Sequence, residues 1–179
     1  MPEIKILVDG KVVEYSGLFR VDEFYGILRR FLKERGYFLF ETQNQEDVLE
    51  GGKQVVQRLE PVKTLSDYAK SKLAIIIHIK NLNDRVITAD GRKQKYQHGS
   101  VNLKFSAFLV TDHRNRWEGT GNMFLLRTLM NKFVKRDMVH TAEESTIKDC
   151  NDLQEELRSY LNMTRFKVEH AAPDKKADF

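Results

Sequence analysis

Long runs of alternating apolar and polar residues between positions 72 and 112 constrain the fold more than any other feature of this sequence. Successive side chains of an extended chain point to opposite faces, so such runs predict β-strands. In the first run, one face carries isoleucines and the other is more polar: Ile75, Ile77 and Ile79 against Ile76, His78 and Lys80. After turn signals at Asp90-Gly91 and His98-Gly99, a last long strand is predicted from Val101 to Thr111. The pattern predicts an antiparallel meander sheet.

The first 36 residues predict a hairpin followed by a helix. Residues 4–8 and 11–16 flank Asp9-Gly10, a pair favoured where both residues of a hairpin turn need positive φ. Residues 21–35 repeat apolar side chains at helical spacing, with acidic residues at the positive end of the helix dipole and Gly36 as a terminator.

Further strands are predicted at 37–41 and 53–65, separated by Gly51-Gly52, and helices at about 123–138 and 142–161. Pro61 cannot donate a hydrogen bond to a sheet, so its strand is expected at an edge or with a bulge. The sequence thus predicts one α+β domain over residues 1–165 and a polar C-terminal tail over 166–179. The order of elements is similar to the helix-grip architecture, in which a curved sheet wraps a long terminal helix.

Composition places the chain among ordinary folded proteins. Of 179 residues, 41% are hydrophobic and 31% charged, which argues against disorder. The longest notable apolar run, Leu73 to Ile77, is too short to span a bilayer, which takes roughly 20 residues. No secretory signal is visible at the N-terminus, so the expected location is the cytoplasm. A single cysteine, Cys150, excludes an internal disulfide.

Several short signatures along most of the chain resemble those of a group of short archaeal proteins of unknown function. They are Gly17-Leu18-Phe19 with Phe24-Tyr25, Gly36-Tyr37 with Glu41, Ser66-Asp67-Tyr68, Asp90-Gly91 with Gly99, and Asp112 with Trp117-Glu118. The resemblance implies a single domain and no particular catalytic or binding residue.

Catalytic and metal-binding motifs are not evident, so we expect a protein without enzymatic activity or cofactor. No histidine pair has the spacing of metal ligands on one helix face. His78 is interpreted as a hydrogen-bonded sheet residue, Asp112-His113 as a solvated strand end, and Cys150 as a buried, inert thiol. Gly119-Thr120-Gly121 precedes a predicted helix; it is either an anion site or, more simply, part of an N-cap.

Positive charge is concentrated in the middle of the chain. Residues 85–136 hold eleven basic and three acidic residues, whereas the rest holds nineteen basic and twenty-three acidic ones, for a net charge of +4. Basic side chains beside aromatic rings suit nucleic acids, because charge follows phosphates and rings stack on bases. The candidate polyanion-binding residues are Arg92, Lys93, Lys95, Tyr96, Arg114, Arg116, Arg127, Lys135 and Arg136. The alternative is a solubilising hairpin tip with Trp117 buried.

Two functions therefore remain open. The first is a non-enzymatic interaction protein, a subunit or accessory factor of a larger assembly, with a basic surface for an acidic protein or RNA; its partners are other subunits or itself. The second is a helix-grip-like domain that binds a small apolar ligand or lipid between the sheet and the last helix. Four phenylalanines would line or fill that cavity: Phe105, Phe108, Phe124 and Phe133.

Overall fold

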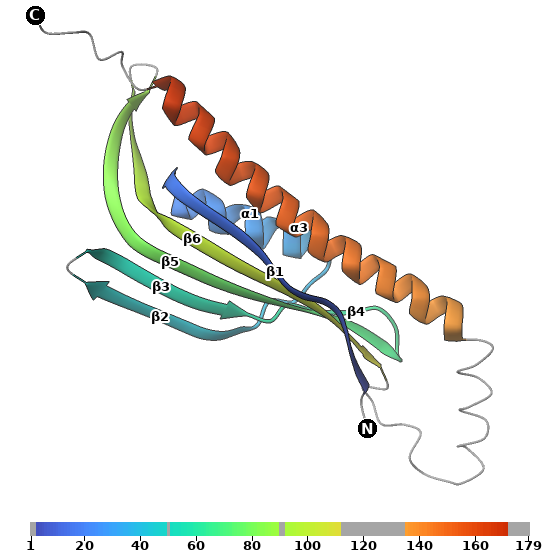
Figure 1. Cartoon of the computed structure of the whole chain (residues 1–179). Coiled ribbons are helices and arrows are strands. Elements are labelled where there is room, and N and C mark those ends of the chain that lie inside the picture. The colour runs from blue at the N-terminus through green and yellow to red at the C-terminus, as the bar shows by residue number, and fades with distance from the viewer. Residues whose placement is uncertain (1–2, 50, 90–91, 112–134, 172–179) are drawn as a thin grey trace, which may run out of the picture.

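The computed structural model describes residues 3–49, 51–89, 92–111 and 135–171, and these form an α+β fold in which two helices cover one face of an antiparallel sheet (Figure 1). The elements are, in chain order, β1 (Glu3–Phe19), α1 (Val21–Glu34), β2 (Glu41–Leu49), β3 (Gly52–Leu59), β4 (Val62–Thr64), β5 (Ala69–Ala89), β6 (Arg92–Thr111) and α3 (Lys135–Ala171). The predicted fold class is thereby confirmed in its general form.

The sheet is organised around the long hairpin of β5 and β6. Its strand order is β1-β6-β5-β3-β2, with β4 paired to β5, so β1 and β2 are the two edges. Opposite partners along the central hairpin share a face, as in Ile77↔Leu103 and His78↔Asn102. We call the side carrying Ile77 and Leu103 the helix face and the side carrying His78 and Asn102 the open face.

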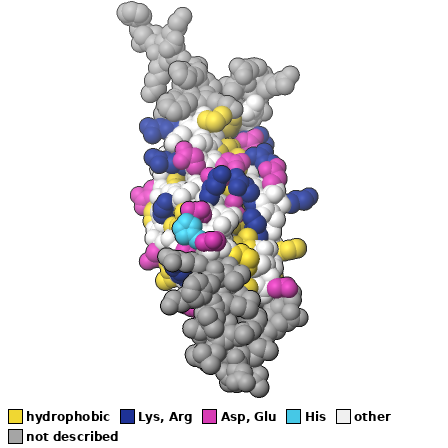
Figure 2. Space-filling model, turned by 90° about the vertical axis from the view of Figure 1, so that its right-hand side faces the viewer, with side chains coloured by type: hydrophobic (Ala, Val, Ile, Leu, Met, Phe, Trp, Pro, Cys, Tyr) yellow, Lys and Arg dark blue, Asp and Glu magenta, His cyan; other side chains and the backbone are white. Residues whose placement is uncertain are grey.

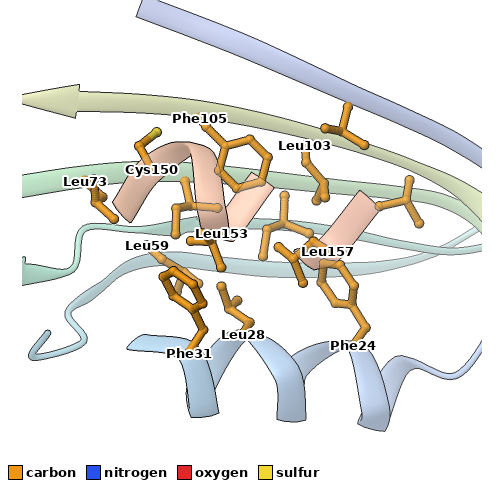
Figure 3. Packing of buried hydrophobic residues seen from close by; sticks show 14 of the residues in the cluster. Phe24, Leu28, Phe31, Leu59, Leu73, Leu103, Phe105, Cys150, Leu153 and Leu157 are labelled. Atoms are coloured by element: carbon orange, nitrogen blue, oxygen red, sulfur yellow. The ribbon is translucent and has the colours of Figure 1, made fainter. Parts of the chain in front are cut away.

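The core lies between the helix face and the two helices. Apolar side chains of the central strands pack there against the inner sides of α1 and α3, as Figure 3 shows for Leu28, Phe105 and Leu153. These three side chains are almost fully buried. Burial of one such side chain contributes roughly 1.5–3 kcal/mol, so this cluster is the main stabilising feature of the fold.

The first helix agrees with its prediction. α1 buries Phe24, Leu28, Phe31 and Leu32 on one side, and Asp22 and Glu23 lie in its first turn. Gly36 follows with φ +76°, a left-handed conformation that glycine adopts without a steric penalty.

The predicted N-terminal hairpin is wrong. β1 is one continuous strand whose two halves both pair with β6, through Val8↔Ala107 and Lys11↔Phe105. Asp9 and Gly10 together oppose a single residue, and Gly10 has φ +61°. The positive φ that suggested a turn is used in a β-bulge, because the 20-residue β6 offers a partner to both halves.

The turn predicted at His98-Gly99 is also wrong, since β6 passes straight through it. Gly99 pairs with Gly17, and a Cβ on Gly99 would approach the carbonyl oxygen of Lys80 to 3.0 Å. Glycine here allows a close approach of two backbones, which is its other role in strands. The turn predicted at Asp90-Gly91 lies outside the described residues.

The C-terminal helical region differs from the prediction of two helices. Residues 135–161 belong to one uninterrupted helix, α3, and no proline or glycine separates 138 from 142. The earlier part of the predicted helix 123–138 lies outside the described residues. Helical backbone continues to Ala171, within the range predicted as a tail, and the domain boundary at 165 stays a prediction.

Pro61 falls between β3 and β4, where the predicted strand 53–65 is interrupted.

Candidate functional site

Four of the predicted polyanion-binding residues lie in the hairpin of β5 and β6. Arg92 and Lys93 begin β6. Lys95 is exposed, and its Nζ lies 2.9 Å from Asp84 Oδ2. Tyr96 is only 9% exposed, and its hydroxyl donates to Gln94 Oε1 at 2.9 Å. Tyr96 therefore does not present its ring for stacking on a base.

Two further members, Lys135 and Arg136, lie at the opposite end of the molecule. α3 follows β1, since Lys5 pairs with Glu143 while Tyr160 contacts the backbone of Arg20. At about 1.5 Å per residue, a helix of 37 residues is about 55 Å long. β6 runs antiparallel to β1, so the hairpin tip lies towards the far end of α3 (Figure 1).

The described members of the predicted set therefore form two separate groups. Arg114, Arg116 and Arg127 lie outside the described residues. On the side shown in Figure 2, Lys and Arg side chains are interspersed with Asp and Glu rather than gathered by sign. Polyanion binding stays a prediction.

The strand β2 is the most exposed element of the sheet. All nine of its residues are exposed, and they form the edge beyond β3. Glu46 forms an ion pair with Lys53 across the β2–β3 ladder. Val48 is 81% exposed and Leu49 is exposed too, so the polar strand ends in two apolar side chains open to solvent.

A second group of exposed apolar residues precedes β2. Phe38, Leu39 and Phe40 are consecutive, and Phe38 is 73% exposed. Their backbone is fixed, because Phe38 and Val62 exchange two hydrogen bonds of 2.9 Å and Phe40 accepts one from Glu60. Apolar side chains on fixed backbone at a sheet edge are typical of protein contact surfaces.

The open face carries a polar hollow of about 520 Å³ over three adjacent strands. Its polar side chains form two rows across the sheet: Ser16, Ser100 and Lys80 in one row, and Glu14, Asn102 and His78 in the next. Asn102 Nδ2 donates to Glu14 Oε1 at 2.8 Å, and the hydroxyls of Ser100 and Ser16 are 3.3 Å apart. We refer to these six residues as the polar hollow.

A buried ionic network joins α1, α3 and the sheet. Asp149, on α3, accepts from Arg35, Lys63 and Tyr37 at 2.8, 3.1 and 3.1 Å. Burial raises the pKa of the Tyr37 hydroxyl; the hydrogen bond with Ser71 opposes this shift, and the Asp149 charge adds to it. Asp149 thus has three donors already in place, as expected of a structural ion pair.

Of the remaining candidate residues, His78 lies in β5 but its side chain makes no hydrogen bond within the described residues, and Cys150 agrees with its structural interpretation. Asp112-His113 and Gly119-Thr120-Gly121 lie outside the described residues. Cys150 is 1% exposed, and burial raises the pKa of its thiol to about 11. No group of three or more potential metal ligands occurs within the part of the chain that the structure describes. Phe105 points into the core and Phe108, three residues later on β6, to the open face, so these two do not line a common cavity. Phe124 and Phe133 lie outside the described residues.

Sequence reasoning missed both the polar hollow and the buried network. The hollow has a weak signal, namely polar residues at alternate positions of three strands, but their proximity depends on the register. Asp149 has no such signal, because an acid beside an apolar helix stripe is ordinarily solvated.

Comparisons with known proteins give no further indication. The chain matches no protein-family model, no curated protein and no solved structure. The resemblance to short archaeal proteins stays an expectation. None of the helices described has both the length and the apolar character needed to cross a membrane.

Proposed function

We propose that the protein is a non-enzymatic interaction protein, a subunit or accessory factor of a larger assembly, and that it contacts a protein partner through β2. The observation that carries this proposal is the exposure of β2 along all nine residues at the edge of the sheet. An edge strand presents unpaired backbone groups that another extended segment can pair with.

The other edge, β1, is protected in ways that β2 is not. β1 has two irregularities of register, which distort an edge and discourage pairing. Its Lys5 and Lys11 reach across to α3, where they contact Glu143 and Asn151. β2 contains no lysine or proline, and its one irregularity lies at its start, between Glu41 and Gln43.

The apolar residues at both ends of β2 provide side-chain contacts for a partner. Full burial of a side chain such as Phe38, Phe40, Val48 or Leu49 contributes roughly 1.5–3 kcal/mol before the cost of association. An extended segment of a partner lying along β2 would cover both groups at once. Backbone pairing and apolar ends together favour a protein as the partner.

Site-specific photo-crosslinking tests this proposal. A photoreactive amino acid replaces Gln45, at the centre of β2, and in a separate variant Glu155, an exposed residue of α3. In cells of the source organism, a discrete protein adduct at position 45 and none at 155 is expected. Absence of an adduct at 45, or the same adducts at both positions, would contradict the proposal. The adduct mass distinguishes a second copy from another protein.

A pair of proline variants, Gln43→Pro and Asn44→Pro, each combined with the photoreactive amino acid at position 45, provides the matched control. Along an edge strand, successive N–H groups point alternately inward to β3 and outward, so one substitution removes an inward and the other an outward donor. The outward variant should retain the circular dichroism of the native fold and lose the adduct. If it formed the adduct as efficiently as the native strand, pairing through β2 would be excluded.

A second candidate function rests on an apolar groove. A groove of about 430 Å³ lies between the β4–β5 connection and α3, lined by Leu65, Tyr68, Met138, Val139 and Ala142 among others. This favours the binding of a small apolar ligand. Decanoate should raise the melting temperature of the native protein, and Ala142→Phe, which fills the groove, should abolish the rise. A rise that survives this substitution would contradict binding there.

A further inference from the structure

The polar hollow has a distribution of donors and acceptors that points to a ligand. Lys80 and His78 lie two residues apart on β5 and project from the same face. Within the described parts of the chain, neither side chain has a hydrogen bond or ion pair. Among the described residues that line the hollow, Glu14 on β1 is the one carboxylate, and Asn102 already donates to it. Donors thus gather at the β5 side and acceptors at the β1 side.

The size of the hollow matches a small molecule rather than a polymer. Neighbouring strands lie about 4.8 Å apart, and two residues along a strand span about 6.8 Å, so the six side chains cover roughly 10 by 7 Å. The next row along the sheet is Val12, Lys104 and Ile76, which is mainly apolar. On that side the polar surface ends, except for Lys104, whose side chain reaches over Gly10 on β1.

We propose that the polar hollow binds a small molecule carrying an oxyanion, either a carboxylate or a phosphate. The Lys80 ammonium and a ring N–H of His78 donate to the oxyanion, and the Ser100 hydroxyl, opposite Lys80, turns from Ser16 to donate from the neighbouring strand. Glu14 accepts from a hydroxyl or ammonium group at the other end of the ligand. This site is independent of the contact proposed for β2, because it lies on the open face over β1, β6 and β5.

Amide NMR with two simple probes tests the site. Inorganic phosphate and acetate are titrated separately into the full chain, with sodium chloride added to keep the ionic strength constant. Saturable shifts are expected at Ser16, Lys80 and Ser100 with at least one probe. Saturation with phosphate alone assigns a phosphate group, and saturation with acetate alone a carboxylate. Shifts that do not saturate with either probe would overturn the proposal.

Three variants separate the site from a general charge effect. Lys80→Gln should weaken binding at least tenfold, whereas Lys148→Gln, the same change on an exposed residue of α3, should leave it unchanged. Glu14→Gln should strengthen binding about twofold, because it removes a negative charge about 10 Å away in a largely aqueous surrounding. Amide spectra away from the hollow report whether each variant is folded. Equal weakening by Lys80→Gln and Lys148→Gln, or weakening by Glu14→Gln, would overturn the proposal.

Discussion

Replacing the buried Asp149 with asparagine should destabilise the fold more than any change to a surface ion pair. The Asp149 side chain is 3% exposed and accepts from two cations and a tyrosine hydroxyl. An asparagine side chain at this position would keep the shape but lose the charge, so Arg35 and Lys63 would face a neutral amide. Hydrogen bonds to a charged group contribute about 1.5–3 kcal/mol each, and removing one member of a buried pair typically costs about 3–5 kcal/mol.

The expected loss is smaller than the simple sum of three contacts. Arg35 is 39% and Lys63 23% exposed, so both cations can regain water. Arg35 also keeps its contact with Asp152 at 2.8 Å. We therefore expect Asp149→Asn to lower the free energy of unfolding by about 2–4 kcal/mol. The control is Arg30→Gln, which breaks the exposed pair with Glu156 and should cost no more than about 1 kcal/mol.

Equilibrium unfolding in urea, followed by far-ultraviolet circular dichroism at pH 7, measures both changes. With a slope of about 2 kcal/mol per molar urea, Asp149→Asn should lower the midpoint by about 1–2 M. The double variant with Arg35→Gln should cost less than the sum of the two single variants, because the residues are in direct contact. A midpoint shift for Asp149→Asn no larger than that for Arg30→Gln would refute the reasoning.

Three further predictions concern the buried thiol, two glycines and the basic residues. Burial raises the pKa of the Cys150 thiol from 9.0 to about 11, so the protonated thiol stabilises the fold at lower pH, and its contribution to the free energy of unfolding should fall between pH 9 and 11. Urea titrations of the native chain and of Cys150→Ala at several pH values check this. Equal slopes of the free energy of unfolding against pH for the two proteins would contradict it. Gly10→Ala should destabilise the fold by about 1 kcal/mol because φ at Gly10 is +61°, whereas Gly26→Ala, inside α1 with open space around it, should stabilise the fold by about 0.5–1 kcal/mol. Melting temperatures that changed in the same direction in both variants would be inconsistent with this. If the central basic residues bind a polyanion, retention on heparin should fall in a variant in which four of them are replaced by glutamine, namely Arg92, Lys93, Arg114 and Arg116. Undiminished retention would exclude polyanion binding by these residues.

The elements predicted correctly were those with a long periodic pattern. The apolar stripe of α1 and the alternation around Ile75, Ile77 and Ile79 each specify one buried face, whatever their partners. Two of the errors, the N-terminal hairpin and the turn at His98-Gly99, came from glycines. A glycine marks a turn, a bulge or a close backbone approach, and which of these it makes depends on the strand beside it. The pairing of β1 with β6 determines that Gly10 lies in a bulge, and the pairing of β6 with β5 determines that Gly99 lies at a close backbone approach.

Proximity between distant residues could not be predicted in the same way. The polar hollow requires two registers: β1 must pair with β6 at Ser16↔Ser100, and β5 must pair with β6 at Lys80↔Ser100. A shift of a strand's register by one residue would turn its side chains to the helix face. Asp149 meets Arg35 only because α1 and α3 pack side by side. Such contacts depend on tertiary packing, which single-sequence patterns do not encode.

The uneven covering of the sheet explains why its exposed surfaces are the places to look for function. Both described helices pack on the helix face, so stability comes from that side and from β1, β6, β5 and β3. β2 contributes no residue to the core, yet ordering a residue's backbone costs roughly 1–2 kcal/mol. Its pairing with β3 offsets part of that cost, but apolar side chains at its ends stay largely exposed in the isolated chain, as Phe38 (73%) and Val48 (81%) show. A partner that covers Phe38 and Val48 would supply the missing burial, and for this reason the stability of β2 should depend on association more than that of any other described strand.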